Sequence, residues 1–175
     1  YDTLITAYSM LNTNRNLVIL GDGPERENLE SLVKKNRLED RVFLLGYSGN
    51  PYMYMKSAYM FVLSSISEGF PNALVEAMCM GLPVISTNCM YGPSEILENN
   101  ASLSFGGGIY KAKYGLLVDT ESPLQLRKAM TMLLDSSSLY DHYSKFARHR
   151  AYDFDEGKIL KEYSDRINKI KIVGK

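Results

Sequence analysis

The sequence predicts an α/β fold: a Rossmann-like, doubly wound parallel sheet with helices on both faces, followed by C-terminal packing helices. Short apolar runs alternate with stretches of helical spacing, and glycine or proline stands at most junctions between them. The runs are rich in β-branched and large side chains without polar alternation, which is typical of strands buried on both faces. The expected strands are 17–20, 42–45, 60–64, 83–87 and 116–118.

Helices are expected between these strands because apolar residues there recur at helical intervals. The expected helices are 1–13, 25–35, 52–58, 72–80, 94–98 and 124–134. From 139 to 175 the pattern is purely helical, and these terminal helices are expected to pack against the domain. The segment 99–114 contains three consecutive glycines, and we expect a long loop there, either a flap over a ligand or a surface loop.

The chain, 1–175, has the length of one ordinary domain, which is enough to bury a core without disulfides or metals. Its first helix begins at Tyr1 with neither a capping residue nor a preceding strand. This abrupt start suggests a piece of a longer protein.

Composition excludes several classes of function. Twenty basic residues balance twenty acidic ones, so no overall field attracts nucleic acid or anionic lipid, and any bound anion must be held locally. No apolar run approaches the roughly 20 residues of a membrane span. Cys79 and Cys89 lack the spacing of metal ligands, and such thiols favour a cytoplasmic protein without a metal site or a disulfide framework.

The first candidate site is the loop after the first expected strand, since ligands of doubly wound sheets bind outside the carboxyl ends of the strands. Gly21 and Gly23 permit a tight turn there, and Pro24 suits the first position of the next helix. The loop lacks the third glycine of a dinucleotide fingerprint and the lysine of a phosphate loop, so a plain turn is an equally good interpretation. Because Asp22 and Glu25 add negative charge, a base or ribose suits this loop better than a phosphate.

A second loop, 64–71, leads from the third expected strand into the helix that starts at Asn72. Asn72 is a good capping residue, and the free amides of a first helical turn suit a diphosphate. Glu68 precedes the helix and Glu76 lies about one turn inside it, so their carboxylates can flank one pocket and accept hydrogen bonds from sugar and ribose hydroxyls. The simpler interpretation is that Glu76 stabilises the helix start and Glu68 is solvated.

The run from Glu68 to Ile85, EGFPNALVEAMCMGLPVI, resembles the signature of the group 1, or GT4, glycosyltransferases, which have the GT-B fold. Both glutamates and the Gly-x-Pro-Val-Ile strand match that signature. The resemblance extends back through 42–47 and 18–24 and forward through 92–97 and 114–118. It therefore covers nearly the whole chain in the expected order.

This resemblance implies the donor-binding half of a retaining glycosyltransferase. Such an enzyme moves a hexose or an N-acetylhexosamine from a nucleoside diphosphate sugar to a saccharide or lipid-linked acceptor, without a cofactor or an obligatory metal. Glu68 matches the catalytic residue near the reacting centre, and Glu76 matches a ribose ligand. The implied donor-binding residues are Glu76, Gly69, Phe70, Pro71, Asn72, Ala73, Leu74, Gly21, Gly23, Gly46 and Tyr47.

A third loop, 91–95, precedes another short helix, and in the family it approaches the donor sugar. Its sequence Gly92-Pro93-Ser94-Glu95 resembles that of transferases which build bacterial surface polysaccharides from UDP-sugars, so a UDP-sugar is the favoured donor. Alternatively, Ser94 and Glu95 only supply polar groups to a helix start.

Two other functions are compatible with such a nucleotide site: a sugar-nucleotide epimerase of the same fold, and a non-catalytic nucleotide-binding module. The two glutamates followed by Gly81-Leu82-Pro83 favour the transferase. In the family, an arginine and a lysine just before the helix that here begins at Tyr1 neutralise the diphosphate, and an acceptor-binding domain precedes them. We therefore expect this chain alone to bind donor weakly and transfer little, and the complete protein to lie in the cytoplasm, at the inner face of the membrane. In enzymes of this fold the last helix commonly crosses back to the other domain, so in isolation its apolar face is expected to be exposed or to pair with another copy.

Overall fold

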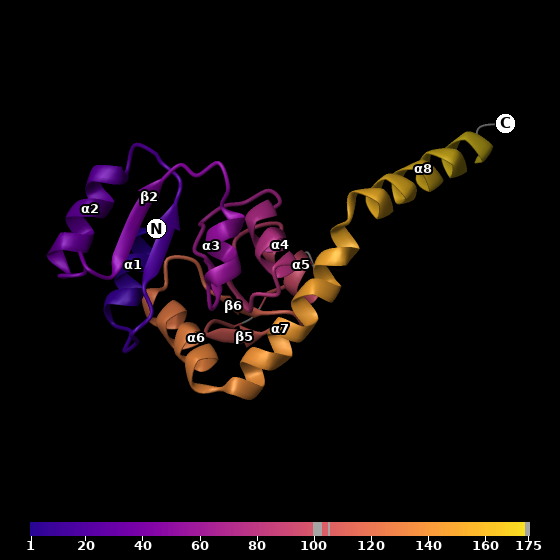
Figure 1. Ribbon diagram of the computed structural model, residues 1–175. Helices are drawn as coiled ribbons and strands as arrows, with labels where there is room; N and C mark the ends of the chain where they lie inside the picture. The colour runs from indigo at the N-terminus through magenta and orange to yellow at the C-terminus, as the bar shows by residue number, and fades with distance from the viewer. Residues whose placement is uncertain (100–102, 105, 174–175) are drawn as a thin grey trace.

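The computed structural model describes residues 1–99, 103–104 and 106–173, and in it strands alternate with helices along the chain (Figure 1). The strands are β1 (Leu17–Leu20), β2 (Val42–Gly46), β3 (Phe61–Leu63), β4 (Val84–Thr87), β5 (Ile109–Lys111) and β6 (Leu116–Val118). The helices are α1 (Asp2–Ser9), α2 (Arg26–Lys35), α3 (Tyr52–Ser57), α4 (Asn72–Cys79), α5 (Pro93–Glu98), α6 (Pro123–Asp135), α7 (Ser137–Ala151) and α8 (Glu156–Val173). A 3₁₀ turn, η1 (Tyr152–Phe154), joins α7 to α8. This order confirms the predicted α/β class.

The strands form two sheets, which divide the expected sheet without changing its parallel, Rossmann-like character. One sheet pairs β1 with β2, and the other has the order β3-β4-β6-β5. Every pair is parallel except β5 with β6. Within the described ranges β1 and β3 form no ladder with each other. Instead, α1 packs on α6, and this helix pair joins the two sheets through one apolar core.

The segment 99–114, expected to be irregular, contains the edge strand β5. Tyr110 lies opposite Leu117 in an antiparallel pair with β6. The run 109–111 ends in a lysine and follows three glycines, so it forms no continuous apolar segment, and the sequence pattern did not reveal this hairpin. Positions 100–102 and 105 lie outside the described residues, and the expectation of a flap or surface loop there stays a prediction.

The two sheets differ in burial. β4 and β6 are buried along their whole length, which confirms the expectation drawn from their continuous apolar runs. In the first sheet Val18, Phe43 and Leu45 are about 40% exposed, with values of 42, 37 and 45%. Ile19 and Val42 of the same strands are buried. The first sheet is therefore covered on one face, and burial on both faces was the wrong expectation for it.

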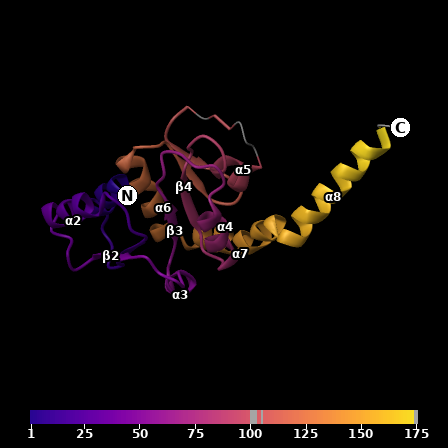
Figure 2. The same cartoon turned by 90° about the horizontal axis from the view of Figure 1, so that it is seen from above.

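Of the terminal helices, α7 packs on the domain and α8 does not. α7 lies against α4 and α6. α8 projects away from the other elements in both views (Figures 1 and 2). Its apolar residues Ile159, Tyr163 and Ile167 recur at helical spacing but are 36, 63 and 50% exposed. Only α7 packs on the domain as expected. No other element of the described chain covers the apolar face of α8, and exposure of that face is the alternative expected for the last helix in isolation.

Tyr143 of α7 links that helix to the segment before β6. Its side chain is 2% exposed, and its hydroxyl donates a hydrogen bond to the carbonyl oxygen of Ala112 at 3.1 Å. Burial, and to a lesser degree the nearby Glu98 carboxylate, raises the pKa of Tyr143 from 10.0 to about 12. The fold favours the neutral phenol, so this contribution to stability is fully present below pH 10 and is lost as pH rises through about 12.

We expect Tyr143→Phe to lower the free energy of unfolding by about 1 kcal/mol at pH 7, because the Ala112 carbonyl loses its donor. The difference between the two proteins should shrink as pH rises from 10 towards 12, where the wild-type phenol ionises. Urea unfolding across this pH range measures both effects. Tyr163→Phe, at an exposed position of α8, is the matched control; equal stability of all three proteins at pH 7 would contradict the prediction.

Candidate functional site

The residues expected to form the site lie at the carboxyl ends of the strands, in two clusters. One cluster follows β1 and β2 and contains Gly21, Gly23, Gly46 and Tyr47. The other follows β3 and contains the segment 64–76. No hydrogen bond or ion pair between described residues joins the clusters, because they belong to different sheets.

In the first cluster two loops lie side by side. The amide of Gly21 donates to the carbonyl oxygen of Gly46 at 2.7 Å. Both glycines have positive φ angles, +115° and +72°, which disfavour any residue with a Cβ. Gly23 lies in the exposed turn before α2, where its amide donates to the Asp22 carboxylate at 3.0 Å, and Tyr47 is 86% exposed. The two loops therefore form a solvent-exposed edge at the carboxyl ends of β1 and β2.

Arg26 holds the first cluster together, and the sequence analysis did not identify it. Its guanidinium donates to the carbonyl oxygen of Leu44 at 3.0 Å and lies 3.6 Å from the Asp22 carboxylate. The loop is thus less negative than its acidic residues suggested. Helix α2 begins at Arg26, so Pro24 is in the preceding turn and does not occupy the first helical position. A positive charge in the first turn of a helix is unfavourable because the helix dipole is positive there. The position of Arg26 could therefore have indicated, from the sequence alone, that its side chain has a specific partner.

In the second cluster, hydrogen bonds fix the loop that carries Glu68. Ser65 Oγ donates to Glu68 Oε1 at 2.7 Å, and Thr87 Oγ1 at the end of β4 donates to the carbonyl oxygen of Ser65 at 2.5 Å. Cys89 lies beside this loop: burial, and then the charge of Glu68, raises the pKa of its thiol, to which the Glu68 amide donates a hydrogen bond. The Glu68 carboxylate is therefore half-buried and held by the ends of two adjacent strands.

The start of α4 leaves several amides without an acceptor. Pro71 occupies the cap position and Asn72 is the first helical residue, so the predicted Asn72 cap is absent. Proline at the cap has no side-chain oxygen, and no described residue accepts a hydrogen bond from the amides of Gly69, Phe70, Asn72 or Ala73. Glu76 lies half-buried one turn further along. These free donors at a helix N-terminus can hold an anion.

The loop before α5 packs directly on this segment. A Cβ added to Gly92 would lie 2.5 Å from Pro71 Cδ and 3.0 Å from the carbonyl oxygen of Gly69. Gly92 and its neighbour Tyr91 have φ angles of +88° and +67°. Such conformations persist where the surrounding structure enforces them. The structure thus brings the second and third sequence motifs into contact, with Ser94 buried and Glu95 exposed in the first turn of α5.

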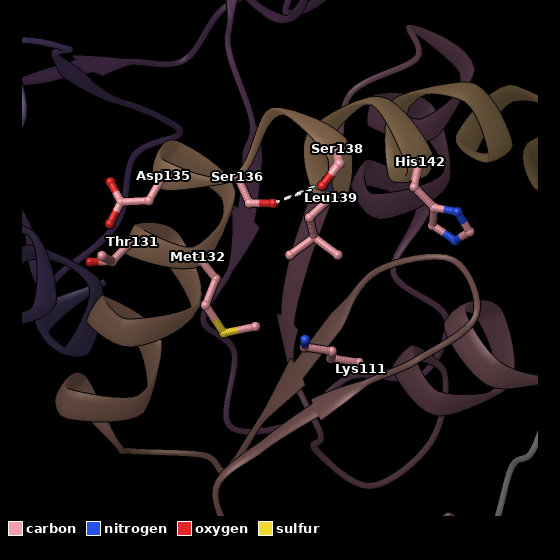
Figure 3. A pocket seen from close by; sticks show the side chains of 8 residues that line it. All are labelled: Lys111, Thr131, Met132, Asp135, Ser136, Ser138, Leu139 and His142. Atoms are coloured by element: carbon pink, nitrogen blue, oxygen red, sulfur yellow. Dashed lines mark hydrogen bonds between the residues drawn. The ribbon is translucent and has the colours of Figure 1, made fainter.

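A hollow of about 510 Å³ lies elsewhere, between the α6–α7 turn and β5 (Figure 3). Its lining residues are Lys111, Thr131, Met132, Asp135, Ser136, Ser138, Leu139 and His142. Lys111 pairs with Leu116, the first residue of β6. The hollow is therefore at the amino ends of the parallel strands, opposite the two clusters. Its lining carries both Lys111 and Asp135, so it has no single sign of charge.

In the part of the chain that the structure describes, no group of three or more His, Cys, Asp or Glu residues is arranged to hold a metal ion. None of the helices in this part is both long enough and apolar enough to cross a membrane.

Comparison with known proteins matches residues 1–150 to the family model of the glycosyl transferases group 1. The chain is 39% identical over 168 residues to an uncharacterized glycosyltransferase of Methanocaldococcus jannaschii, covering 86% of this chain and 41% of the relative. It is 33% identical over 159 residues to the N-acetylgalactosamine-N,N'-diacetylbacillosaminyl-diphospho-undecaprenol 4-alpha-N-acetylgalactosaminyltransferase of Campylobacter jejuni, covering 91% of this chain and 40% of the relative. The chain thus spans about two fifths of the length of these relatives.

Among solved structures, the fold is similar to that of Anabaena HepE in complex with UDP. The TM-score is 0.81 at 20% sequence identity, and the match covers 95% of this chain and 44% of HepE. A second HepE structure, in complex with UDP-glucose, gives a TM-score of 0.78. These similarities establish the fold as one half of a GT-B architecture, as the sequence predicted.

We expect Gly92→Ala to destabilise the protein by about 2 to 4 kcal/mol, because it adds a Cβ at positive φ and places it against Pro71. Gly49→Ala is the matched control, since its Cβ would meet nothing within 4 Å, and it should change stability by less than about 0.5 kcal/mol. Urea unfolding gives the free energies. Similar values for the two variants would show that the contact between the loops is not close.

Proposed function

The chain belongs to the glycosyl transferases group 1 family, and we propose that it is a single domain, the donor-binding half of a retaining glycosyltransferase. The reaction proposed is transfer of a hexose or an N-acetylhexosamine from a UDP-sugar to a saccharide or lipid-linked acceptor. The observation that carries this proposal is the group of free amides at the start of α4, between the carboxylates of Glu68 and Glu76.

We assign the diphosphate to the segment Gly69–Leu74. In a group transfer of this kind the sugar–phosphate bond breaks, negative charge grows on the leaving diphosphate and the sugar becomes oxocarbenium-like. Amides without an internal acceptor stabilise the leaving charge without reorganisation, because no hydrogen bond within the protein has to break first. Glu68, held by Ser65, is the carboxylate assigned to the reacting end of the sugar. Glu76, inside the helix, is assigned to the ribose hydroxyls.

The base is assigned to the edge formed by Gly21, Gly23, Gly46 and Tyr47. There the paired loops leave backbone groups accessible, and the exposed Tyr47 ring offers a stacking surface. Uracil is favoured because HepE, which has the same fold, was solved with UDP and with UDP-glucose. A nucleoside diphosphate sugar is then the substrate, and the proposed reaction uses no further cofactor or metal.

The acceptor and the cellular role rest on the relatives. The name of the Campylobacter jejuni relative describes a saccharide on diphospho-undecaprenol as the acceptor. We propose a similar saccharide or lipid-linked acceptor here, a role in surface polysaccharide synthesis, and a cytoplasmic site of action at the inner membrane face. The relatives are more than twice as long as this chain. An acceptor-binding domain in the remaining part is proposed, so that this chain alone binds donor weakly and transfers little.

Calorimetric titration with UDP, GDP and ADP tests the donor site. We expect UDP to bind with a dissociation constant of about 1 mM or tighter, and Glu76→Ala to weaken binding by about tenfold, the loss of one charged hydrogen bond to ribose. Glu39→Ala, an exposed acid between α2 and β2, is the matched control and should leave the affinity unchanged. Absence of binding by all three nucleotides, or equal binding by both variants, would refute the assigned site.

The role of Glu68 requires the chain joined to its acceptor-binding part. We expect Glu68→Gln to reduce the rate of sugar transfer by about 100-fold or more, with UDP affinity changed less than the rate. The anomeric configuration of the product, measured by NMR, should match that of the donor. An inverted product would contradict the retaining mechanism, and full activity of Glu68→Gln would remove Glu68 from the catalytic role.

A further inference from the structure

The elbow between α7 and α8, made of Arg150, Asp153 and Phe154, reaches the segment Gly69–Leu74 through a contact of two aromatic rings. The ring of Phe154 in η1 lies edge-on to the ring of Phe70, with 5.4 Å between centroids and an interplanar angle of 61°. Phe154 is half-buried, whereas Phe70 is 43% exposed. The contact joins positions 84 residues apart in the sequence, and nothing in the motif of the loop predicts it.

Arg150 holds Phe154 in place. Its guanidinium lies over the Phe154 ring at 4.5 Å from the centroid. The same group donates to the carbonyl oxygens of Glu95 and Ile96 in α5, both at 2.8 Å, and its residue is only 9% exposed. Phe154 therefore rests on a cation that is itself fixed by backbone carbonyls.

Asp153 forms ion pairs with residues on both sides of the elbow. Its carboxylate lies 3.1 Å from Arg150 and 3.5 Å from Lys158 in α8. Burial acts to raise the pKa of Asp153, but the hydrogen bonds and charges of Arg150 and Lys158 outweigh it and hold the pKa below its usual value. Asp153 is thus ionised at neutral pH, and it connects the end of α7 to the start of α8.

The segment Gly69–Pro71 has support on two sides. Gly92 packs under Pro71, and Phe154 packs against Phe70. A Cβ at Gly69 would meet no atom within 4 Å, whereas the carbonyl oxygen of Gly69 lies close to Gly92. Phe70 carries one of the free amides, and Phe154 is the ring that packs against its side chain. Loss of that ring removes one of the two supports of the segment.

We propose that Phe154 is a positioning residue for the diphosphate-binding segment Gly69–Leu74. Its ring fixes Phe70, and through it the direction of the amides that receive the leaving diphosphate. The proposal rests on the proposed function for its consequence in binding. Phe154 lies in η1, so the residue that would support the donor site is at the point where α8 leaves the domain.

Backbone ¹⁵N relaxation tests the positioning without any ligand, because order parameters report how rigidly each amide is held. In Phe154→Ala the order parameters of Gly69, Phe70, Asn72 and Ala73 should fall below those of the wild type, while those of the buried strand β4 stay the same. Phe146→Ala, an exposed phenylalanine on α7, is the matched control and should leave both sets unchanged. If Phe154→Ala and Phe146→Ala give the same order parameters in these four residues, the proposal is overturned.

A double-mutant cycle tests how the effect reaches the ligand. We expect Phe154→Ala to weaken UDP binding by about fivefold, the order of an edge-to-face ring pair. In a Phe70→Ala background the same change should have no further effect, whereas a general loss of stability would act in both backgrounds. Phe154→Leu keeps the apolar bulk and so preserves folding, but it removes the contact between the rings. It should show a loss of UDP affinity between those of the wild type and Phe154→Ala. Equal losses in both backgrounds would overturn the proposal.

The two hypotheses fail in different ways. If the wild type binds none of the nucleotides, the proposed function fails, and the order parameters still decide whether Phe154 positions the segment. If the wild type binds UDP and Phe154→Ala binds it equally well, the positioning role fails while the donor site stands.

Discussion

Helix α7 satisfies backbone carbonyls at the ends of two other helices, and the geometry of the site depends on these contacts. Ser144 Oγ donates to Gly81 O at 2.8 Å and Arg148 to Met80 O at 3.1 Å, at the C-terminal end of α4. Arg150 does the same for carbonyls of α5. Carbonyls of a last helical turn have no partner within their own helix, so such donors fix where the helix ends. Both helices are therefore anchored through backbone carbonyls by side chains of α7.

This anchoring leaves the opposite end of α4 free to interact with a ligand. The amides before and at the start of the helix have no acceptor among described residues, and the loop that carries them is braced by Thr87, Gly92 and Phe154. A rigid scaffold with unpaired donors loses little on binding an anion, because the donors need not reorganise. The same packing thus fixes the C-terminal end of α4 and leaves the amides at its N-terminal end without acceptors.

Several details of the fold and the site were accessible from the sequence, and others were not. The apolar runs located β1, β2, β3, β4 and β6 to within one residue at each end, because a strand that packs on a core needs apolar side chains. Propensity rules failed at Pro24 and Asn72. Pro24 lies two residues before the first helical position, which proline prefers, and Asn72 lies one residue after the cap position, which asparagine prefers. Local preferences of about 1 kcal/mol are easily overridden by tertiary packing. The roles proposed for Glu68, Glu76 and the glycine loops came from motif and strand order, and they stay predictions.

By itself, the sequence determined the α/β class, the order of strands and helices, and the motif that marks the family, since these depend on residue type and spacing along the chain. Only the tertiary structure decided which distant groups meet. Arg26 ties two loops together, Cys89 lies beside Glu68, Gly92 packs on Pro71 and Phe154 packs on Phe70. Such contacts depend on how helices cross and where loops close. Periodicity carries no information about these, because many packings bury the same apolar faces.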